Sequence, residues 1–589
     1  MPSGFNTDAL RPVLPTAKPA IFLQDACFQH RYIRSRDTST IFERPERLRA
    51  VTVGLAAAMS RLEGVAPPDN LKTLDPDDLA SQLGRLNIES NTTTNDPLKR
   101  ASQPVSIVQS TASADLLRHP AVKYVHGDID GDVYLENLAR WTKECRYKIE
   151  KGESEIPEHL SQGDLYLCPE SLVAIQGAIG TVCEAVDAVA GSAQPVFVNQ
   201  LPETPVRPVN RAFVAVRPPG HHCGEDTPSG FCFVNNVAIG AAHAHLIHGI
   251  NRIVILDIDL HHGNGTQSIV WQMNEETYRQ TLETEGGAPA SKKGPQVYYG
   301  SIHDILSYPC EDGKAELVQA ASVSIAGSHG QYIENVHLQT YTSPEHWEKL
   351  YTEQYSKILR KAENFLDSTG GPGSDVLVFI SCGMDASEHE TPSMSRHNRR
   401  VPTSFYHRFA RDACALAEQY AGGKVISVLE GGYSDRALTS GSMAHLAGLV
   451  DAPVDEEWWS TENLVLLEKA TKKRRGGRPS LTPANVHPWL ERAVALFTSL
   501  DGSLAHSSAS APRAPLPPSS MTLRDRKKPN SAATSAASSP RGKAVAAAGE
   551  AEASSSDSSS SDDSPPPSAS AAEKKLPRVI LRLGPAPAS

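Results

Sequence analysis

The sequence lacks the cysteine pairs and the long apolar runs that define whole classes of protein. Its nine cysteines are scattered, and none of them forms a CxxC pair. This usage argues against a disulfide framework and favours a reducing compartment. No stretch approaches about 18 uninterrupted apolar residues, and residues 1–18 lack the basic and apolar blocks of a secretion signal. We therefore expect a soluble protein that is not secreted and does not bind a membrane.

The chain also has few aromatic residues and no excess of basic charge. Aromatic residues make up 6%, and the formal net charge is -11. This charge argues against general nucleic-acid binding, and we expect no sequence-specific DNA binding. Hydrophobic and charged contents of 39% and 21% are typical of a globular protein that carries some polar low-complexity sequence. A length of 589 residues is enough for one large α/β domain with additional segments.

The composition changes sharply after Leu500. Ser, Ala and Pro dominate there and aromatic residues vanish, so the segment cannot bury enough apolar surface to offset the entropy lost on ordering. Helical periodicity in residues 489–497 places the end of the folded region just before this change. We assign residues 1–17 to a flexible N-terminus, 18–500 to one catalytic domain and 501–589 to a disordered tail.

Between residues 211 and 444, short β-branched runs alternate with longer segments of helical periodicity. This alternation predicts an α/β fold with an open, mostly parallel sheet and helices on both faces. The expected strands are 213–216, 252–257, 297–302, 322–326, 375–381 and 424–429, and the expected helices are 236–248, 345–367 and 404–420. Segments 86–114 and 284–295 are interpreted as peripheral insertions. Ligand chemistry in such sheets lies at the carboxyl ends of the strands.

Four of these strands run directly into polar clusters, at residues 217–222, 257–262, 381–385 and 430–433. Asp257, Asp259 and His261 alternate with period two, which places them on one side of an extended segment. A catalytic zinc ion needs about three protein ligands and one open position. Asp259 and His261 supply two ligands, and Asp385, at the end of another strand, is the natural third. An isolated Asp-x-His segment more often caps a helix, so this prediction depends on the neighbouring clusters.

Two further motifs carry side chains suited to acid/base work. His221 and His222 follow a rigid Pro-Pro-Gly turn, and histidine is the side chain best placed to exchange protons near neutral pH. Tyr433 follows a Gly-Gly turn, where small residues let the backbone approach a ligand and a phenol can point into the site. Each motif alone is also typical of an ordinary polar loop.

Taken together, these motifs resemble the zinc-dependent histone deacetylases in order and spacing. The segments that carry the resemblance are 217–222, 228–236, 257–265, 301–303, 382–385 and 430–433, with 42–48 and 164–169 nearer the N-terminus. The resemblance covers roughly residues 18 to 500. Asn264 and the Glu430-Gly-Gly turn resemble the class II branch, and residues 385–390 resemble a fungal subgroup. The resemblance implies the arginase/deacetylase fold and hydrolysis of acetyl-lysine in histones or other proteins, with a role in transcriptional repression.

The same resemblance implies roles for individual residues. Asp259, His261 and Asp385 would bind Zn²⁺, and Tyr433 would donate a hydrogen bond to the substrate carbonyl. His221 and His222 would handle protons, with the division between them left open because Asn264 stands where other branches place an Asp partner for His222. The remaining implied roles concern residues around the zinc site. Asp257 would orient His221 and would hold a structural K⁺ together with Ser301. The tunnel for the acyl-lysine stem would be lined by Gly230, Phe231 and Tyr308, and Arg47 would lie in an internal cavity beneath the zinc.

Outside the catalytic motifs, three segments bear on location and partners. The basic run at 472–479 is either a nuclear import signal or a solvated loop, and we expect the protein in the nucleus, with the cytoplasm as an additional location. The Ser/Asp run at 554–564 would become strongly acidic on phosphorylation. The segment from Pro577 to Leu581 resembles the PxVxL motif bound by chromoshadow domains, a short pattern that also arises by chance.

Two other functions compete with protein deacetylation. The chain could instead hydrolyse small acetylated amines such as polyamines, or serve as an inactive corepressor scaffold. A complete ligand set together with Tyr433 disfavours the scaffold. The long tail and the basic runs favour a macromolecular substrate over a polyamine.

Overall fold

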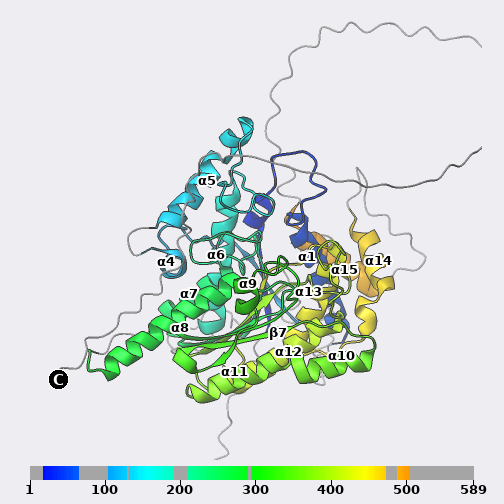
Figure 1. The fold of residues 1–589 in the computed structure, drawn as a ribbon. Helices are drawn as coiled ribbons and strands as arrows, with labels where there is room; N and C mark the ends of the chain where they lie inside the picture. Colours follow the sequence, from blue (N-terminus) through cyan, green and yellow to red (C-terminus); the bar gives the residue numbers. More distant parts are fainter. Residues whose placement is uncertain are drawn as a thin grey trace, which may run out of the picture. The chain divides into compact units, whose positions relative to one another are not determined.

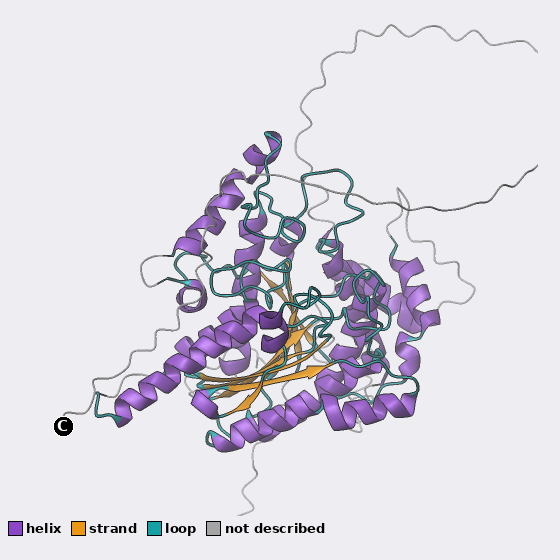
Figure 2. Ribbon diagram, viewed as in Figure 1, coloured by secondary structure: helices purple, strands orange, loops and turns teal. Residues whose placement is uncertain are grey.

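A computed structural model describes residues 18–65, 104–128, 132–191, 209–289, 293–472 and 487–503. Figure 1 and Figure 2 show a twisted sheet between layers of helices. Within the described residues the sheet has nine strands in the order β2-β1-β3-β9-β8-β4-β5-β7-β6. Neighbouring strands are parallel, except that β6 runs antiparallel to β7. The predicted fold class is confirmed by this arrangement.

The strands follow the apolar runs of the sequence. Their bounds are β1 Ala20–Gln24, β2 Ser106–Ser110, β3 Arg211–Ala215, β4 Arg252–Asp257, β5 Gln296–His303, β6 Ser324–Ala326, β7 Tyr332–His337, β8 Val376–Cys382 and β9 Val425–Leu429. Strands β4, β8 and β9 are buried along their whole length, as expected for parallel strands covered on both faces. The register pairs Asp257 with both Ser301 and Ser381, so the carboxyl ends of β4, β5 and β8 lie level with one another.

Helices cover both faces of the sheet. Their bounds are α1 Glu46–Val65, α4 Pro120–His126, α5 Val133–Glu150, α6 Ser171–Gly191, α7 Asn236–His248, α8 Asn264–Glu285, α9 Ala315–Ala320, α10 Pro344–Leu350, α11 Lys357–Ser368, α12 Ser404–Tyr420, α13 Asp435–Leu449, α14 Thr461–Thr471 and α15 Pro488–Leu500. Helices α6, α7 and α8 lie on one face, and α11 and α12 lie on the other (Figure 1). Helix α1 packs against α13 and α15, which joins the two ends of the described chain.

Helix α7 illustrates how the sequence determines an element. The Asn235 side chain accepts a hydrogen bond from the Ala238 N–H at its start, and Gly249 ends it in a left-handed conformation with φ of 66°. Its small residues allow close packing, because a Cβ at Gly240 would lie 2.8 Å from Val182 of α6 and 3.2 Å from Phe379 of β8. The whole helix is consequently held between α6 and the centre of the sheet.

Helix α6 is long and apolar enough to cross a membrane by length and composition alone. In this structure, however, 67% of its apolar window is buried, and it packs against β1, β3 and α7. A core helix of a soluble domain passes the same test, so we treat α6 as part of the core.

The structure confirms most predicted elements and corrects three expectations. The bounds of α7 and α12 match the predicted helices, and the six predicted strands are present. The interpretation of 86–114 as a peripheral insertion is wrong for Ser106–Ser110, which forms β2 beside β1. The single helix expected at 345–367 is divided into α10, a π-helical turn at Tyr351–Tyr355 and α11. The strand expected at 322–326 is short and antiparallel.

Candidate active site

Four neighbouring strands at the centre of the sheet end at one place. Strands β3, β9, β8 and β4 are consecutive in the sheet, and the polar clusters at 217–222, 430–433, 382–385 and 257–262 follow them in turn. The parallel direction of these strands brings all four clusters to the same edge. The predicted convergence is confirmed.

Asp259, His261 and Asp385 form a buried set of three metal-ligand side chains. One donor atom from each lies within 4.8 Å of the other two. His261 Nδ1 is 3.1 Å from Asp259 Oδ1 and 3.0 Å from Asp385 Oδ2. Two carboxylates and an imidazole are a donor set that zinc accepts, with a fourth position free for water or substrate. The residues present therefore fit the metal that the sequence predicts.

Backbone groups hold the two carboxylates in position. The Gly431 N–H donates to Asp259 Oδ2 over 2.8 Å, and the Leu260 N–H donates to Asp385 Oδ1 over 2.8 Å. Gly431 must be glycine for a steric reason, because a Cβ there would lie 2.5 Å from Asp259 Oδ2 and closer still to Asp385 Oδ2. The Gly-Gly turn thus brings its backbone directly against the metal-ligand set.

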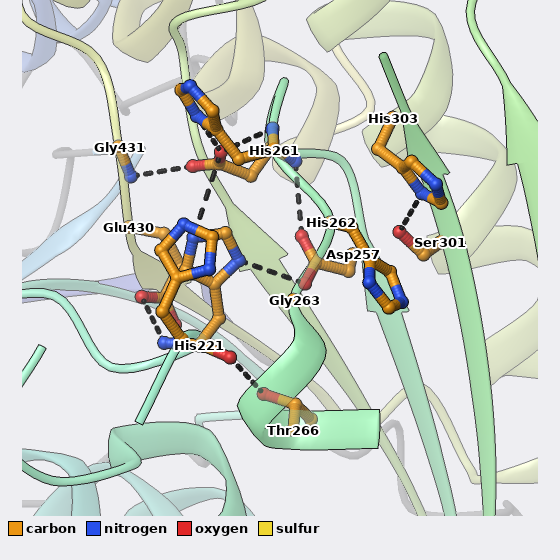
Figure 3. A network of polar contacts seen from close by, with 12 residues as sticks. His221, Asp257, His261, His262, Gly263, Thr266, Ser301, His303, Glu430 and Gly431 are labelled. Carbon is orange, nitrogen blue, oxygen red and sulfur yellow. Dashed lines mark hydrogen bonds and ion pairs between the residues drawn. The ribbon is translucent and has the colours of Figure 1, made fainter. Parts of the chain in front are cut away.

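His221 lies between carboxylates (Figure 3). Its Nδ1 is 3.2 Å from Asp257 Oδ2, and its Nε2 is 3.7 Å from Asp259 Oδ1. Burial alone would lower the pKa of His221, but Asp259 and Asp257 raise that pKa to about 10. Glu430 fixes the backbone of this turn, because its Oε2 accepts the N–H groups of Gly220 and His221 over 2.7 and 3.2 Å.

His222 has a different environment. Its Nδ1 lies 2.8 Å from Asn264 Oδ1, so the neutral ring donates from Nδ1 and keeps Nε2 as an acceptor. Burial, and then the nearby His221, lower the pKa of His222 well below its usual value. The amide of Asn264 carries no charge that would offset these effects. The two adjacent imidazoles are therefore held in opposite protonation states.

A cavity of about 180 Å³ opens above the metal-ligand set. The predicted tunnel residues Gly230, Phe231 and Tyr308 lie on its wall. Both Gly230 and Phe231 have positive φ, 50° and 69°, and a positive φ is uncommon for phenylalanine. The remaining lining residues are Phe42, Asp164, His222, His261, Leu306, Ser307, Glu311, Ser393, Met394, Arg396, His397 and Tyr433. Of the two adjacent histidines His221 and His222, only His222 lines the cavity.

Two side chains contact the ring of Tyr433. The Phe231 ring lies 5.5 Å away and the Arg47 guanidinium lies 4.8 Å from the ring centroid. Glu390 holds the backbone, because its Oε2 accepts the N–H groups of Tyr433 over 2.7 Å and Ser434 over 3.1 Å. Sequence reasoning included Glu390 only in the segment 385–390 that resembles a fungal subgroup and gave it no role in the site. A residue that acts through backbone N–H groups leaves no motif by which it could be found.

Arg47 lies beneath Tyr433 within a buried ionic cluster. It donates to the Gly432 carbonyl over 2.6 Å and pairs with Glu43 at 3.0 Å. Arg217 donates from Nε to the same carboxylate over 2.7 Å. Burial would raise the pKa of Glu43, but Arg217 and Arg47 hold it well below its usual value. The cluster ties the N-terminal segment to the loop that carries Tyr433.

The surroundings of Asp257 differ in part from expectation. Its Oδ2 accepts the Tyr299 hydroxyl over 3.1 Å, a contact that sequence reasoning missed. Ser301 is beside Asp257 in the sheet register, but its hydroxyl is hydrogen bonded to His303 Nδ1 over 2.9 Å. Asp257 therefore contacts His221 as expected, whereas Ser301 has a different side-chain partner.

Comparison with known proteins agrees with this site. The histone deacetylase domain matches residues 99–449. Histone deacetylase HOS3 of Saccharomyces cerevisiae is 34% identical over 505 residues, which are 82% of this chain and 64% of the yeast protein. Type-2 histone deacetylase 2 of Dictyostelium discoideum is 30% identical over 306 residues, or 50% of this chain and 15% of that protein. This chain thus spans less than two thirds of the length of these relatives.

Among solved structures, the HD domain of HDA15 is similar with a TM-score of 0.48 and 20% identity, over 82% of this chain and all of that domain. The domain match covers more than half of this chain and contains all four strand ends of the site. The chain therefore belongs to the histone deacetylase family.

Proposed function

We propose that this chain hydrolyses the acetyl amide of acetyl-lysine in histones or other proteins and releases lysine and acetate. The observation that carries the proposal is the meeting of a buried metal-ligand set, one neutral histidine and one buried phenol at a single cavity. The family is zinc-dependent in general, and Asp259, His261 and Asp385 are the residues that would hold Zn²⁺. Bound zinc would polarise the acetyl carbonyl and lower the pKa of water to about 7.

His222 is the proton carrier in this proposal. It lies on the cavity wall and has an acceptor nitrogen free, whereas His221 lies behind it against Asp257. His222 therefore takes the proton from the attacking water and delivers it to the leaving lysine amine. His221 stays protonated beside its carboxylates and supplies positive charge to the site.

Tyr433 is the hydrogen-bond donor to the substrate carbonyl. Burial raises the pKa of its hydroxyl well above the usual value, so the phenol keeps its proton throughout the neutral range. A fixed donor of this kind stabilises the charge that develops on the carbonyl oxygen in the transition state. The aromatic walls at Phe231 and Tyr308 suit the methylene stem of the acyl-lysine.

The decisive experiment measures acetate release from an acetyl-lysine peptide by the full chain. Activity should require zinc and be lost with a chelator. Tyr433→Phe should reduce kcat by about 10² to 10³ with a small change in KM, since removal of one oxyanion donor costs that much. A folded, zinc-loaded protein without turnover on any acetylated substrate would favour the scaffold function.

Hydrolysis of acetylated polyamines is the second candidate. Asp164 and Glu311 line the cavity and would attract the free ammonium groups of a polyamine, although Arg396 also lies there. Parallel kcat/KM measurements on an acetyl-lysine peptide and an acetylpolyamine decide between the two substrates. A higher value for the polyamine would replace the main proposal.

Two further proposals concern the domain bounds and a monovalent cation. We infer that residues 18–500 form the catalytic domain; the predicted segment 1–17 and all but the first three residues of the predicted tail 501–589 lie outside the described residues. A structural K⁺ beside Asp257 is favoured by Ser381 Oγ, a buried atom in register with Asp257 that has no hydrogen bond among the described residues. Replacing K⁺ by a larger monovalent cation should lower the thermal midpoint Tm.

Nuclear location and binding of a chromoshadow domain complete the set of proposals. The segment from Pro577 to Leu581 and all but the first residue of the basic run at 472–479 lie outside the described residues, so these two proposals depend on the two sequence motifs alone. Deleting residues 574–589 should abolish chromatin recruitment and leave peptide deacetylation intact. Unchanged recruitment would eliminate the motif as a docking segment.

A further inference from the structure

A second group of metal-ligand side chains lies apart from the residues of the active site. Cys183 and Asp187 are one turn apart on α6, and His243 and His248 lie on the neighbouring α7. His119, at the N-cap of α4, faces the same place, because its ring stacks on that of His243 with centroids 5.6 Å apart. We call these five residues the His243 cluster.

Two sets of three donors meet at His243. The donor atoms of His119, Cys183 and His243 lie within 4.8 Å of one another, and so do those of Asp187, His243 and His248. In the second set, Asp187 Oδ1 is 2.8 Å from His243 Nε2 and 2.7 Å from His248 Nε2. These two contacts are hydrogen bonds, and they hold one carboxylate oxygen and two imidazole nitrogens at one place.

The position in the fold favours a cation. Asp187 and His248 lie near the carboxyl ends of α6 and α7, where the helix dipoles carry partial negative charge. The Asp187 side chain is 53% exposed and that of His248 is 18% exposed, so an ion can enter from solvent. His243 and Cys183 are buried beneath them.

One donor of the first set lacks a hydrogen-bond partner within the described part of the chain. His119 Nδ1 is buried and has no hydrogen bond among the described residues. An unpaired buried nitrogen is unfavourable, and coordination to a metal would satisfy it.

We propose that the His243 cluster binds a second divalent transition-metal ion, with Zn²⁺ as the preferred ion and His243 as the ligand common to both sets. Imidazole, thiolate and carboxylate are the donors of zinc sites, whereas Mg²⁺ and Ca²⁺ require mainly oxygen ligands. In either set the ion links α6 to α7. Its binding does not depend on the proposed catalytic activity.

Zinc stoichiometry of the full chain tests the proposal. Protein loaded with zinc and dialysed against zinc-free buffer should retain two ions per chain by elemental analysis. His243→Gln removes the ligand common to both sets, so this variant should retain one ion and full peptide deacetylation, and Asp259→Asn should retain the other ion. The proposal is wrong if the wild-type protein retains only one ion, and if that ion is lost in Asp259→Asn but kept in the variant of the His243 cluster.

Cobalt substitution tests the ligands directly and does not require activity. In the Asp259→Asn chain, bound Co²⁺ should show ligand-field absorption, and His243→Gln should remove it. A sulfur-to-cobalt charge-transfer band that is lost in Cys183→Ser places the ion in the His119 set, whereas ligand-field absorption without that band places it in the Asp187 set. Failure of this chain to bind cobalt refutes the site. His248→Gln, at a partly exposed position, replaces His243→Gln if the latter does not fold.

Discussion

Replacing Gly431 by Ala tests whether the Gly-Gly turn positions the metal ligands. A Cβ at residue 431 would lie 2.5 Å from Asp259 Oδ2, whereas ordinary contacts of a Cβ begin at 3.4 Å. The Asp259 carboxylate must therefore move by about 1 Å, and such a misplacement costs about 10²-fold in rate. This loss corresponds to about 2.7 kcal/mol of transition-state stabilisation. Because φ at Gly431 is not positive, the effect is steric rather than conformational.

The assay is kcat/KM for an acetyl-lysine peptide, measured together with zinc content and the thermal midpoint. Gly224→Ala is the matched control, because a Cβ there meets no atom within 4 Å although the residue lies two positions after His222. The control should behave as wild type in all three measurements. Wild-type kcat/KM and zinc content in a folded Gly431→Ala protein would refute the argument from close approach.

Three further changes test other parts of the structure. Asn264→Asp places a carboxylate 2.8 Å from His222 and should raise the pKa of that ring. The limb of the pH–rate profile that reports His222 should then move to higher pH. An unchanged profile would show that this contact is not formed. Glu390→Gln weakens the hydrogen bonds to the Tyr433 backbone, so the fold decrease in kcat should be about ten times the fold increase in KM. Equal fold changes in kcat and KM would contradict a positioning role. The third concerns acid stability: burial lowers the pKa of three histidines to about 3, 4 and 3, so they are neutral when folded and protonated when unfolded below pH 6.5. They are His30, His126 and His445. The contribution of these histidines to the free energy of unfolding is therefore fully present above about pH 6.5 and falls with decreasing pH, by up to about 2 kcal/mol per histidine at pH 5. Equal urea midpoints at pH 7 and pH 5 would contradict this expectation.

The centre of the fold could be predicted because two local signals coincide there. Apolar β-branched runs such as Arg252–Asp257 end abruptly in polar clusters, and this change marks the carboxyl end of a buried strand. Helix α7 has an Asn cap and a terminal glycine, which is why its predicted bounds were correct. Strands β1 and β2 lie outside the predicted alternation of residues 211–444, and β7 lies within it but was not predicted; the membership of all three in the sheet depends on tertiary pairing.

The limits of prediction within the site have a similar cause. Metal-ligand and proton-handling side chains are recognisable by their chemical type and spacing. The residues that orient them are not, because Glu390 and Glu430 act by accepting backbone N–H groups and Tyr299 approaches Asp257 only through sheet pairing. The difference between His221 and His222 likewise depends on which charges surround each ring in the folded chain.

The order of strands in the sheet has a consequence for synthesis of the protein. Strand β9 is the last strand in the described sequence, yet it lies between β3 and β8. Until residues 425–429 have left the ribosome, the growing chain holds β3 and β8 with open parallel edges, and open edges promote aggregation. A nascent or truncated chain that ends before Val425 therefore exposes two unpaired strands at the middle of its sheet, and such chains depend most on chaperones.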